Sequence, residues 1–335
     1  RILRGSLASV GLLLLILDAK TALIGAREGL QLCIMTVIPS LFPFFFLSIL
    51  LTSSLSCSTV PLPFISKLTG IPKGSESVFL IGLIGGYPTG AQSVATLYRN
   101  GQLTKKQAER MLGFCSNAGP AFLFGIAAAN FTAPFTGWIL WIIHILSAIM
   151  VSLILPGRSN GSITLHPCRQ PTMQEILRKS LLIMAQVCGW ILLFRLMIAY
   201  LNRWFLWYFE DWVQIAINGM VELTIGCTAL RYIANEGLRL ILCSALISFG
   251  GLCVTMQTAS VTKELSLKSY FPGKVLQTGF SVLLASSYQQ LLLPSESNLP
   301  LSPLFYCILL LGIIIFAFLY GKAEKRCSIP ALHGV

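Results

Sequence analysis

The chain has 335 residues, of which 55% are hydrophobic and only 11% are charged, and its mean hydropathy is +0.77. Because a water-soluble domain carries about 25% charged residues, this composition excludes that class and indicates a multi-pass integral membrane protein in a lipid bilayer. The net charge is +12, but the basic residues lie in short segments between apolar runs, as the positive-inside rule expects for a membrane protein. We therefore predict no nucleic-acid partner.

The N-terminal part predicts one helix over residues 1–29, whose apolar run at 6–17 is short for a full span. The next apolar run, residues 30–55, is long enough to cross the membrane but carries Pro39 and Pro43. Proline removes a helix hydrogen bond and clashes with the preceding turn, so we expect this segment to be kinked.

The segment 78–98 has the hydropathy of a span, but its centre reads GGYPTG at residues 85–90. Each glycine inside a helix costs about 1 kcal/mol and a proline about 3 kcal/mol. A continuous helix is therefore unfavourable here, and the segment predicts a re-entrant hairpin, in which two half-helices meet at an irregular tip.

A helix start is predicted at Thr104, because Thr104 and Gln107 have the spacing of a capping box. The basic residues that follow, among them Arg110, are expected on a solvated face near anionic headgroups. The apolar run 111–131 is broken at residues 116–120 (SNAGP), and the span at 138–155 completes a first repeat over residues 30–155. Residues 156–171 form a polar linker.

The second half, residues 172–293, has the same order of segments. A plain span at 176–201 precedes a second hairpin at about 213–233, which we expect to be interrupted at Gly219 and Gly226. The segment 238–260 is broken by Gly250 and Gly251 and carries Gln257, and a further span is expected at 275–293. Residues 294–335 predict a C-terminal helix and a basic tail.

Glu222 is a lone acid in the uncharged apolar stretch 212–230. An ionisable residue at membrane depth costs about 2.5–3.5 kcal/mol, so it faces a cavity or a partner and marks a transport path. The alternative is a structural acid that caps a neighbouring half-helix. Arg195 has two readings as well, because its head either reaches the membrane interface or attracts an anion.

Each half thus contains a plain span, a glycine-interrupted segment and a second broken segment. Paired interruptions in corresponding places indicate a transporter site near the bilayer midplane. The predicted fold is all-α, with two inverted-topology repeats that each contain a re-entrant hairpin and an unwound helix.

Four motifs together resemble the nucleoside-recognition, or Gate, family, and within it the sporulation branch: residues 85–91 (GGYPTGA), 114–120 (FCSNAGP), 221–224 (VELT) and 249–257 (FGGLCVTMQ). Such proteins are distantly similar to concentrative nucleoside transporters, which place two re-entrant hairpins and two unwound helices around a central site. By this likeness the first and third motifs are the hairpin tips, and the second and fourth are the unwound helices.

The resemblance implies transport of dipicolinic acid from the mother cell across the outer forespore membrane of a spore-forming bacterium. The implied substrate-binding residues are Tyr87, Pro88, Thr89, Gly90, Ser116, Asn117, Ala118, Gly119, Glu222, Thr224, Gly250, Gly251 and Gln257. Helix N-termini at the breaks would attract the anion. Burial raises a carboxyl pKa, so a protonated Glu222 would donate to a solute carboxylate and couple a proton to transport.

Other interpretations stay open. Tyr-Pro-Thr and Gly-Gly-Leu stand where nucleoside transporters carry ribose-contacting residues, yet a transporter of nucleosides or another small polar metabolite is the second reading. The alternative for Asn117 and Gln257 is interhelical hydrogen bonding, and the alternative for residues 87–90 is a simple kink. A scaffold in spore maturation without a substrate is a third class.

The sequence has no HExxH and no GxxxxGK[ST] motif, and its one match to GxSxG, residues 157–161 (GRSNG), lies in the polar linker and not on a turn from a strand to a helix. We therefore expect no enzymatic activity, no cofactor and no metal site. Whether the protein forms a homo-oligomer is left open by the sequence.

Overall fold

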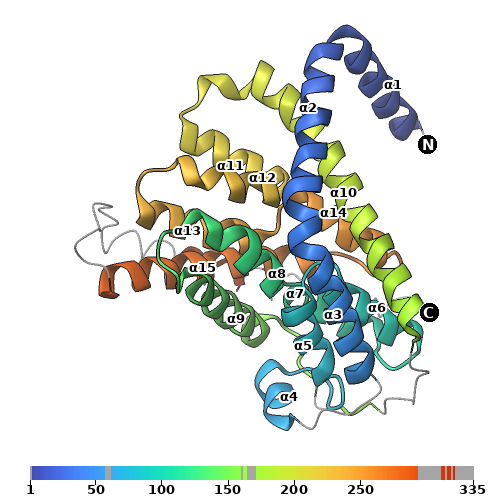
Figure 1. Ribbon diagram of the computed structural model, residues 1–335. Coiled ribbons are helices and arrows are strands. Elements are labelled where there is room, and N and C mark those ends of the chain that lie inside the picture. Colours follow the sequence, from blue (N-terminus) through green and yellow to red (C-terminus); the bar gives the residue numbers. More distant parts are fainter. Residues whose placement is uncertain are drawn as a thin grey trace, which may run out of the picture.

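The computed structural model describes residues 2–56, 62–159, 161–163 and 171–292, with a few further positions between 311 and 320. These residues form helices joined by short connections (Figure 1), and an isolated bridge joins Lys73 and Ser162. No strand occurs in these ranges, which confirms the all-α class. The predicted C-terminal helix and basic tail at 294–335 lie largely outside the described residues.

The N-terminal region consists of α1 (Ile2–Leu17), α2 (Ala19–Leu32), the π-helical segment η1 (Cys33–Val37) and α3 (Ile38–Ser56). The break lies at Asp18, whose side chain accepts the N–H of Thr21 at 3.2 Å and so caps α2. The boundary expected after residue 29 is wrong, because α2 runs past it. At the expected proline kinks, the wider turn of η1 directly precedes Pro39, and the chain continues as helix through Pro43 in α3.

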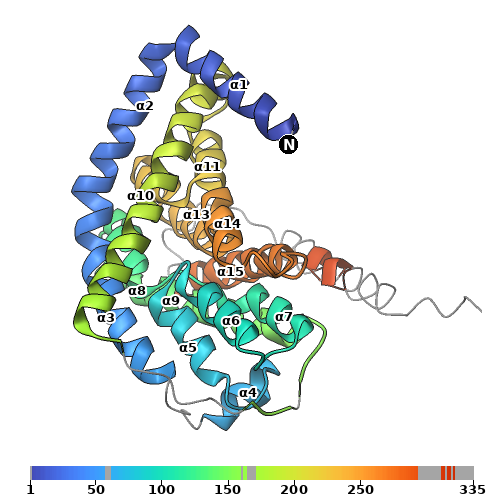
Figure 2. The same ribbon diagram turned by 90° about the vertical axis from the view of Figure 1, so that its right-hand side faces the viewer.

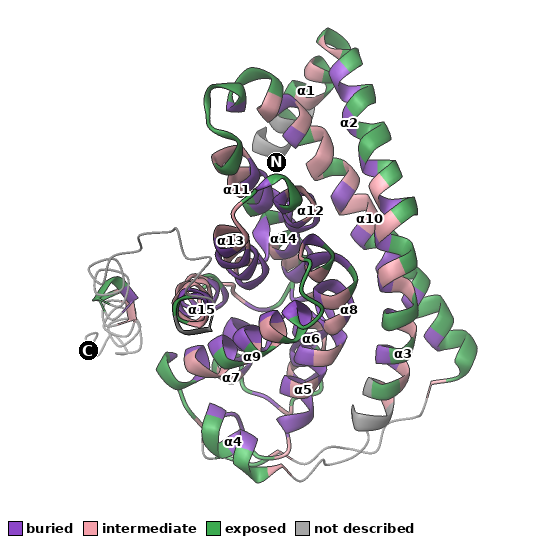
Figure 3. Cartoon of the chain, turned by 60° about the vertical axis from the view of Figure 1, so that its left-hand side comes forward, coloured by how far each residue is buried: buried purple, intermediate pink, exposed green. Residues whose placement is uncertain are grey.

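A second long helix, α10 (Met173–Trp204), lies beside α2 and α3 (Figure 2). It starts with a capping box between Thr172 and Glu175. The outward faces of these helices expose large apolar side chains, such as Leu30, Met35 and Leu193, and Figure 3 shows this exposure along α2, α3 and α10. Apolar side chains on the outside are what a helix in contact with lipid presents.

The first group of short helices contains the predicted tip. It comprises α4 (Pro63–Thr69), α5 (Glu76–Gly85), α6 (Thr89–Arg99), α7 (Lys105–Cys115), α8 (Pro120–Phe122), η2 (Leu123–Ala127), η3 (Ala128–Asn130) and α9 (Thr136–Ile154). Helices α5 and α6 fold back on each other around residues 86–88, and the run from α7 is broken at residues 116–119. Both predicted breaks are confirmed, as is the capping box at Thr104.

A second group of short helices follows α10. It comprises η4 (Leu206–Tyr208), α11 (Asp211–Val221), α12 (Leu223–Ala229), η5 (Leu230–Tyr232), α13 (Glu236–Phe249) and α14 (Gly251–Val261). The predicted break at Gly250 is confirmed. The predicted interruptions at Gly219 and Gly226 are wrong, because the chain breaks at Glu222 and the two glycines lie inside helices. They pack against each other instead, since a Cβ on Gly226 would lie 2.2 Å from the Cα of Gly219.

Five helical segments among the described residues are long and apolar enough to cross a membrane: Ala19–Leu51, Lys105–Asn130, Thr136–Ile154, Met173–Trp204 and Glu236–Val261. The protein is thus a multi-pass integral membrane protein. One further long helix, α15 (Tyr270–Leu292), packs on α7, α9 and α13 (Figures 1 and 3).

Arg110 is not on the solvated face that the sequence predicts. Its side chain is 4% exposed and donates to four backbone carbonyl oxygens, those of Thr69, Gly70, Ser152 and Leu155, at 2.7–3.2 Å. The five donors of a guanidinium suit such a role, since they satisfy several carbonyl groups at once. Arg110 thereby ties α7 to the ends of α4 and α9.

Candidate solute-binding cavity

Three of the helix breaks line one cavity of about 50 Å³: the α5–α6 turn, the break after α7 and the α11–α12 turn. Its wall is formed by Leu41, Phe45, Gly85, Gly86, Tyr87, Gly119, Ala121, Phe122, Val187, Ile191, Glu222, Leu223, Thr224, Val254 and Gln257. These residues come from the α5–α6 turn, the break after α7, the α11–α12 turn and α14, together with α3 and α10. The volume exceeds the roughly 10–15 Å³ that a single water molecule requires, and it is well below that of a pocket for a drug-sized ligand.

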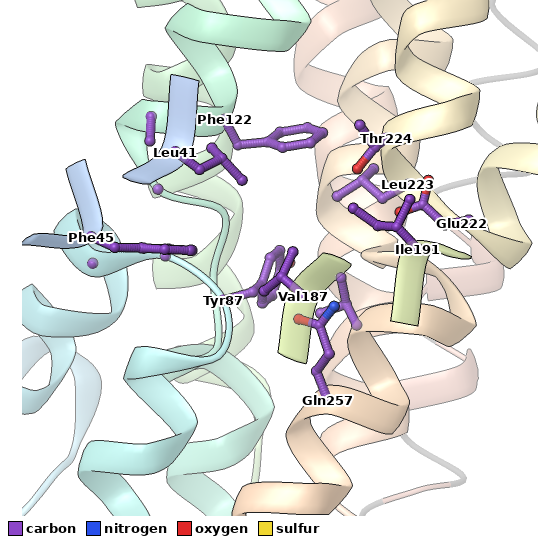
Figure 4. A pocket seen from close by; sticks show the side chains of 15 residues that line it. Leu41, Phe45, Tyr87, Phe122, Val187, Ile191, Glu222, Leu223, Thr224 and Gln257 are labelled. Atoms are coloured by element: carbon purple, nitrogen blue, oxygen red, sulfur yellow. The ribbon is translucent and has the colours of Figure 1, made fainter. Parts of the chain in front are cut away.

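Tyr87 supplies the main polar group of the first turn. Figure 4 shows Tyr87 in the middle of the cavity wall, between Phe45 on one side and Val187 and Gln257 on the other. Its hydroxyl donates to the carbonyl oxygen of Ile247 at 3.2 Å and lies 3.3 Å from the Nζ atom of Lys274. The positive φ of Gly86, 69°, makes the turn that presents Tyr87.

Glu222 lies at the second turn and is 2% exposed. Its Oε2 atom accepts the N–H of Ile225 at 2.7 Å, so the carboxyl group caps α12. The capping role that the sequence allowed is therefore present. Glu222 also contributes to the cavity wall together with Thr224, as Figure 4 shows, so capping and a place at the cavity coexist.

Of the residues predicted to bind substrate, Tyr87, Gly119, Glu222, Thr224 and Gln257 line the cavity. The other eight do not line this cavity: Pro88, Thr89, Gly90, Ser116, Asn117, Ala118, Gly250 and Gly251.

Several of these residues have partners inside the protein. Thr89 donates to the carbonyl oxygen of Gly86 at 2.7 Å, and Asn117 donates to that of Phe114 at 2.7 Å. The backbone N–H of Ala118 donates to the Nε2 atom of His144 at 3.0 Å. For Asn117 the interhelical interpretation holds, because its Oδ1 atom accepts from Gln277 on α15 at 3.0 Å.

The apolar part of the wall could not be recognised from the sequence. Leu41 and Phe45 on α3, and Val187 and Ile191 on α10, are ordinary residues of apolar spans. They lie far from the four motifs in sequence, and only the packing of α3 and α10 against the turns brings them to the cavity.

Lys274 is the second group that the sequence analysis missed. The expected span began at residue 275, whereas α15 begins at Tyr270 and includes Lys274 in its second turn. The side chain is 1% exposed. Its ammonium donates to the carbonyl oxygen of Ser116, to Gln277 Oε1 at 2.9 Å and to the Tyr87 hydroxyl.

The chain is similar to sporulation integral membrane protein YlbJ of Bacillus subtilis (strain 168). The two are 25% identical over an alignment of 300 residues that covers 75% of this chain and 74% of the relative. This similarity confirms the resemblance to a sporulation membrane protein that the four motifs indicate. No protein-family model matches the chain, and no solved structure matches it with significance.

Proposed function

We propose that the protein is a transporter of a small anionic aromatic solute, and that this solute is dipicolinic acid, moved from the mother cell across the outer forespore membrane during sporulation. Similarity to a sporulation integral membrane protein supports the cellular process. The observation that carries transport is the meeting of helix breaks from both halves of the chain at one interior cavity. Broken helices around a site within the membrane are the arrangement that secondary transporters use.

The chemistry of the cavity supports an aromatic solute. The side chains of Phe45, Tyr87 and Phe122 offer apolar ring surface, and Thr224 and Gln257 offer hydrogen-bonding groups. Pockets for small aromatic molecules combine apolar walls with a few placed polar groups. A nucleoside shares these features, so nucleosides and other small polar metabolites are the second candidate class. The ammonium group behind Tyr87 favours the anion.

In this proposal the α5–α6 and α11–α12 pairs are the re-entrant hairpins of two inverted-topology repeats. Each pair turns at the cavity, and each packs through a pair of glycines, Gly82 with Gly90 and Gly219 with Gly226. Small residues at such contacts let two helix backbones approach closely within a membrane. Because the cavity holds only about 50 Å³, the hairpins must move apart to admit the solute.

Glu222 is the proposed site of ion coupling. In its protonated form the carboxyl group would donate a hydrogen bond to a solute carboxylate, while its other oxygen continues to accept the N–H of Ile225. Loading of the solute would then require a proton, and release of both would complete the cycle.

The test is uptake of radiolabelled dipicolinate into liposomes that contain the purified protein, with protein-free liposomes as the control. Saturable uptake that unlabelled dipicolinate competes away supports the proposal, and competition by nucleosides alone favours the second class. In parallel, a deletion strain should make spores that lack dipicolinate while the mother cell accumulates it. A strain with this defect, together with a purified protein that transports nothing, would favour a scaffold role, and turnover of an added lipid or peptide would favour an enzyme.

A further inference from the structure

We propose that Lys274 is a cation built into the transporter, and that its ammonium group occupies the position of a co-transported metal ion. This inference rests on the proposed function and has two consequences. Uptake needs neither Na⁺ nor K⁺, and a positive charge held behind Tyr87 attracts a solute carboxylate in the cavity.

The surroundings of the Lys274 ammonium are those of a bound cation. Three oxygens receive its N–H groups: the carbonyl of Ser116, Oε1 of Gln277 and the hydroxyl of Tyr87. An ammonium has three donors and no acceptor, so each donor has a partner. All three oxygens are neutral, and within the described part of the chain no carboxylate lies at ion-pair distance from Nζ.

The position of this group is that of an ion site in a transporter with broken helices. Ser116 is the C-cap of α7, where the chain unwinds. Carbonyl oxygens of unwound backbone and the C-terminal ends of half-helices are the groups that coordinate Na⁺ in such proteins. The negative end of the α7 dipole points toward the same place and stabilises a cation there.

The fold brings Lys274 to this position by a close helix crossing. Gly273 packs on Gly113, since a Cβ on Gly273 would lie 2.3 Å from the carbonyl oxygen of Gly113. This contact sets α15 against the last turn of α7. One turn further along α15, Gln277 accepts from Lys274 and donates to Asn117 at 3.0 Å, so the two side chains hold residues 116 and 117 together.

Tyr87 connects the cation with the cavity. Its hydroxyl is 3.3 Å from Nζ and its ring centroid is 5.2 Å from it, while the same side chain lines the cavity. An anionic solute in the cavity is therefore separated from the ammonium by a single side chain, in surroundings where electrostatic attraction is weakly screened. A buried charge with only neutral partners is costly, and an arriving carboxylate would relieve this cost.

The test measures dipicolinate uptake into liposomes with Na⁺, K⁺ or choline as the external cation. We expect wild-type rates that agree within about twofold in all three. Lys274→Met should lower the rate at least tenfold in every salt, whereas Lys268→Met, at an exposed position just before α15, should keep the wild-type rate. The uptake rate of Lys274→Ala should rise at least threefold when either n-propylammonium or Na⁺ is added. n-Propylammonium has the length of the removed part of the side chain.

Three results would overturn the inference. A wild-type rate that falls more than tenfold when choline replaces Na⁺ would show that a metal ion is needed, and this measurement requires no variant. Wild-type uptake by Lys274→Met would show that the ammonium is dispensable, and a Lys274→Ala protein that neither cation restores would show that Lys274 only supports the fold. Absence of wild-type uptake in all three salts refutes the proposed function and this inference with it.

Discussion

Replacing Gly90 with alanine tests the close packing of the first helix pair. A Cβ atom at this position would lie 2.1 Å from the carbonyl oxygen of Cys115 and 2.7 Å from the Cα atom of Gly82. Both neighbours are backbone atoms, so neither can rotate away, and α6 must shift by more than 1 Å to reach ordinary contact distance. Overpacking of a tight interior costs about 1–3 kcal/mol, and with backbone on two sides we expect about 3 kcal/mol.

A loss of about 3 kcal/mol corresponds to a fall in Tm of roughly 4 °C, at an unfolding entropy of about 2.1 cal/mol/K per residue over 335 residues. The assay is thermal unfolding of the purified protein in detergent, paired with dipicolinate uptake, which should fall because α6 no longer seats against α7. Gly189→Ala is the matched control, because nothing lies within 4 Å of a Cβ at that position of α10. A Gly90→Ala protein with a Tm within 2 °C of wild type and full uptake would refute the packing argument.

Three further changes test other parts of the structure. Glu222→Gln should lower uptake at least tenfold and abolish its pH dependence. The amount of protein in the membrane should stay the same, since the amide oxygen can still cap α12. Unchanged uptake at every pH would exclude Glu222 from coupling. Arg110→Lys should lower the free energy of unfolding by about 3 kcal/mol, because one ammonium cannot serve four carbonyl groups, and denaturation that matches the wild type would contradict this. Single cysteines can be placed at the exposed positions Lys73 and Asn100, in a protein whose accessible native cysteines are removed. Both should react with an impermeant reagent from the same side of the membrane. Labelling from opposite sides would exclude a re-entrant hairpin.

The helix breaks were the most predictable feature of this chain, because each follows from local chemistry. Residues 85–90 combine glycine with proline, and the breaks at 116–119 and at Gly250 lie in similar glycine-containing stretches. The resemblance places the second tip at residues 221–224, where the chain does break at Glu222, whereas the interruptions expected at Gly219 and Gly226 from glycine content are wrong. Glycine in a helix costs little when it allows another backbone to approach closely, and that approach depends on partners that the local sequence does not reveal.

The buried cations were the least predictable feature. Arg110 follows Lys105 and Lys106 in an amphipathic pattern that is typical of a solvated face, yet it is buried because the ends of α4 and α9 present carbonyl oxygens to it. Lys274 stands at the edge of an apolar run, where hydropathy places a membrane boundary. In both cases neutral oxygens stabilise the charge, and at least one of them comes from a distant segment. No pattern of acidic residues could have indicated these partners.

The two turns at the cavity are associated with groups of opposite charge. The first presents Tyr87 with a lysine ammonium behind it, and the second presents the carboxyl group of Glu222. An anion that enters the cavity is attracted by the first turn and repelled by an ionised Glu222. Protonation of Glu222 removes the repulsion and adds a hydrogen-bond donor. In the proposed mechanism the fixed cation therefore selects the charge of the solute, and the acid determines when that solute can be held.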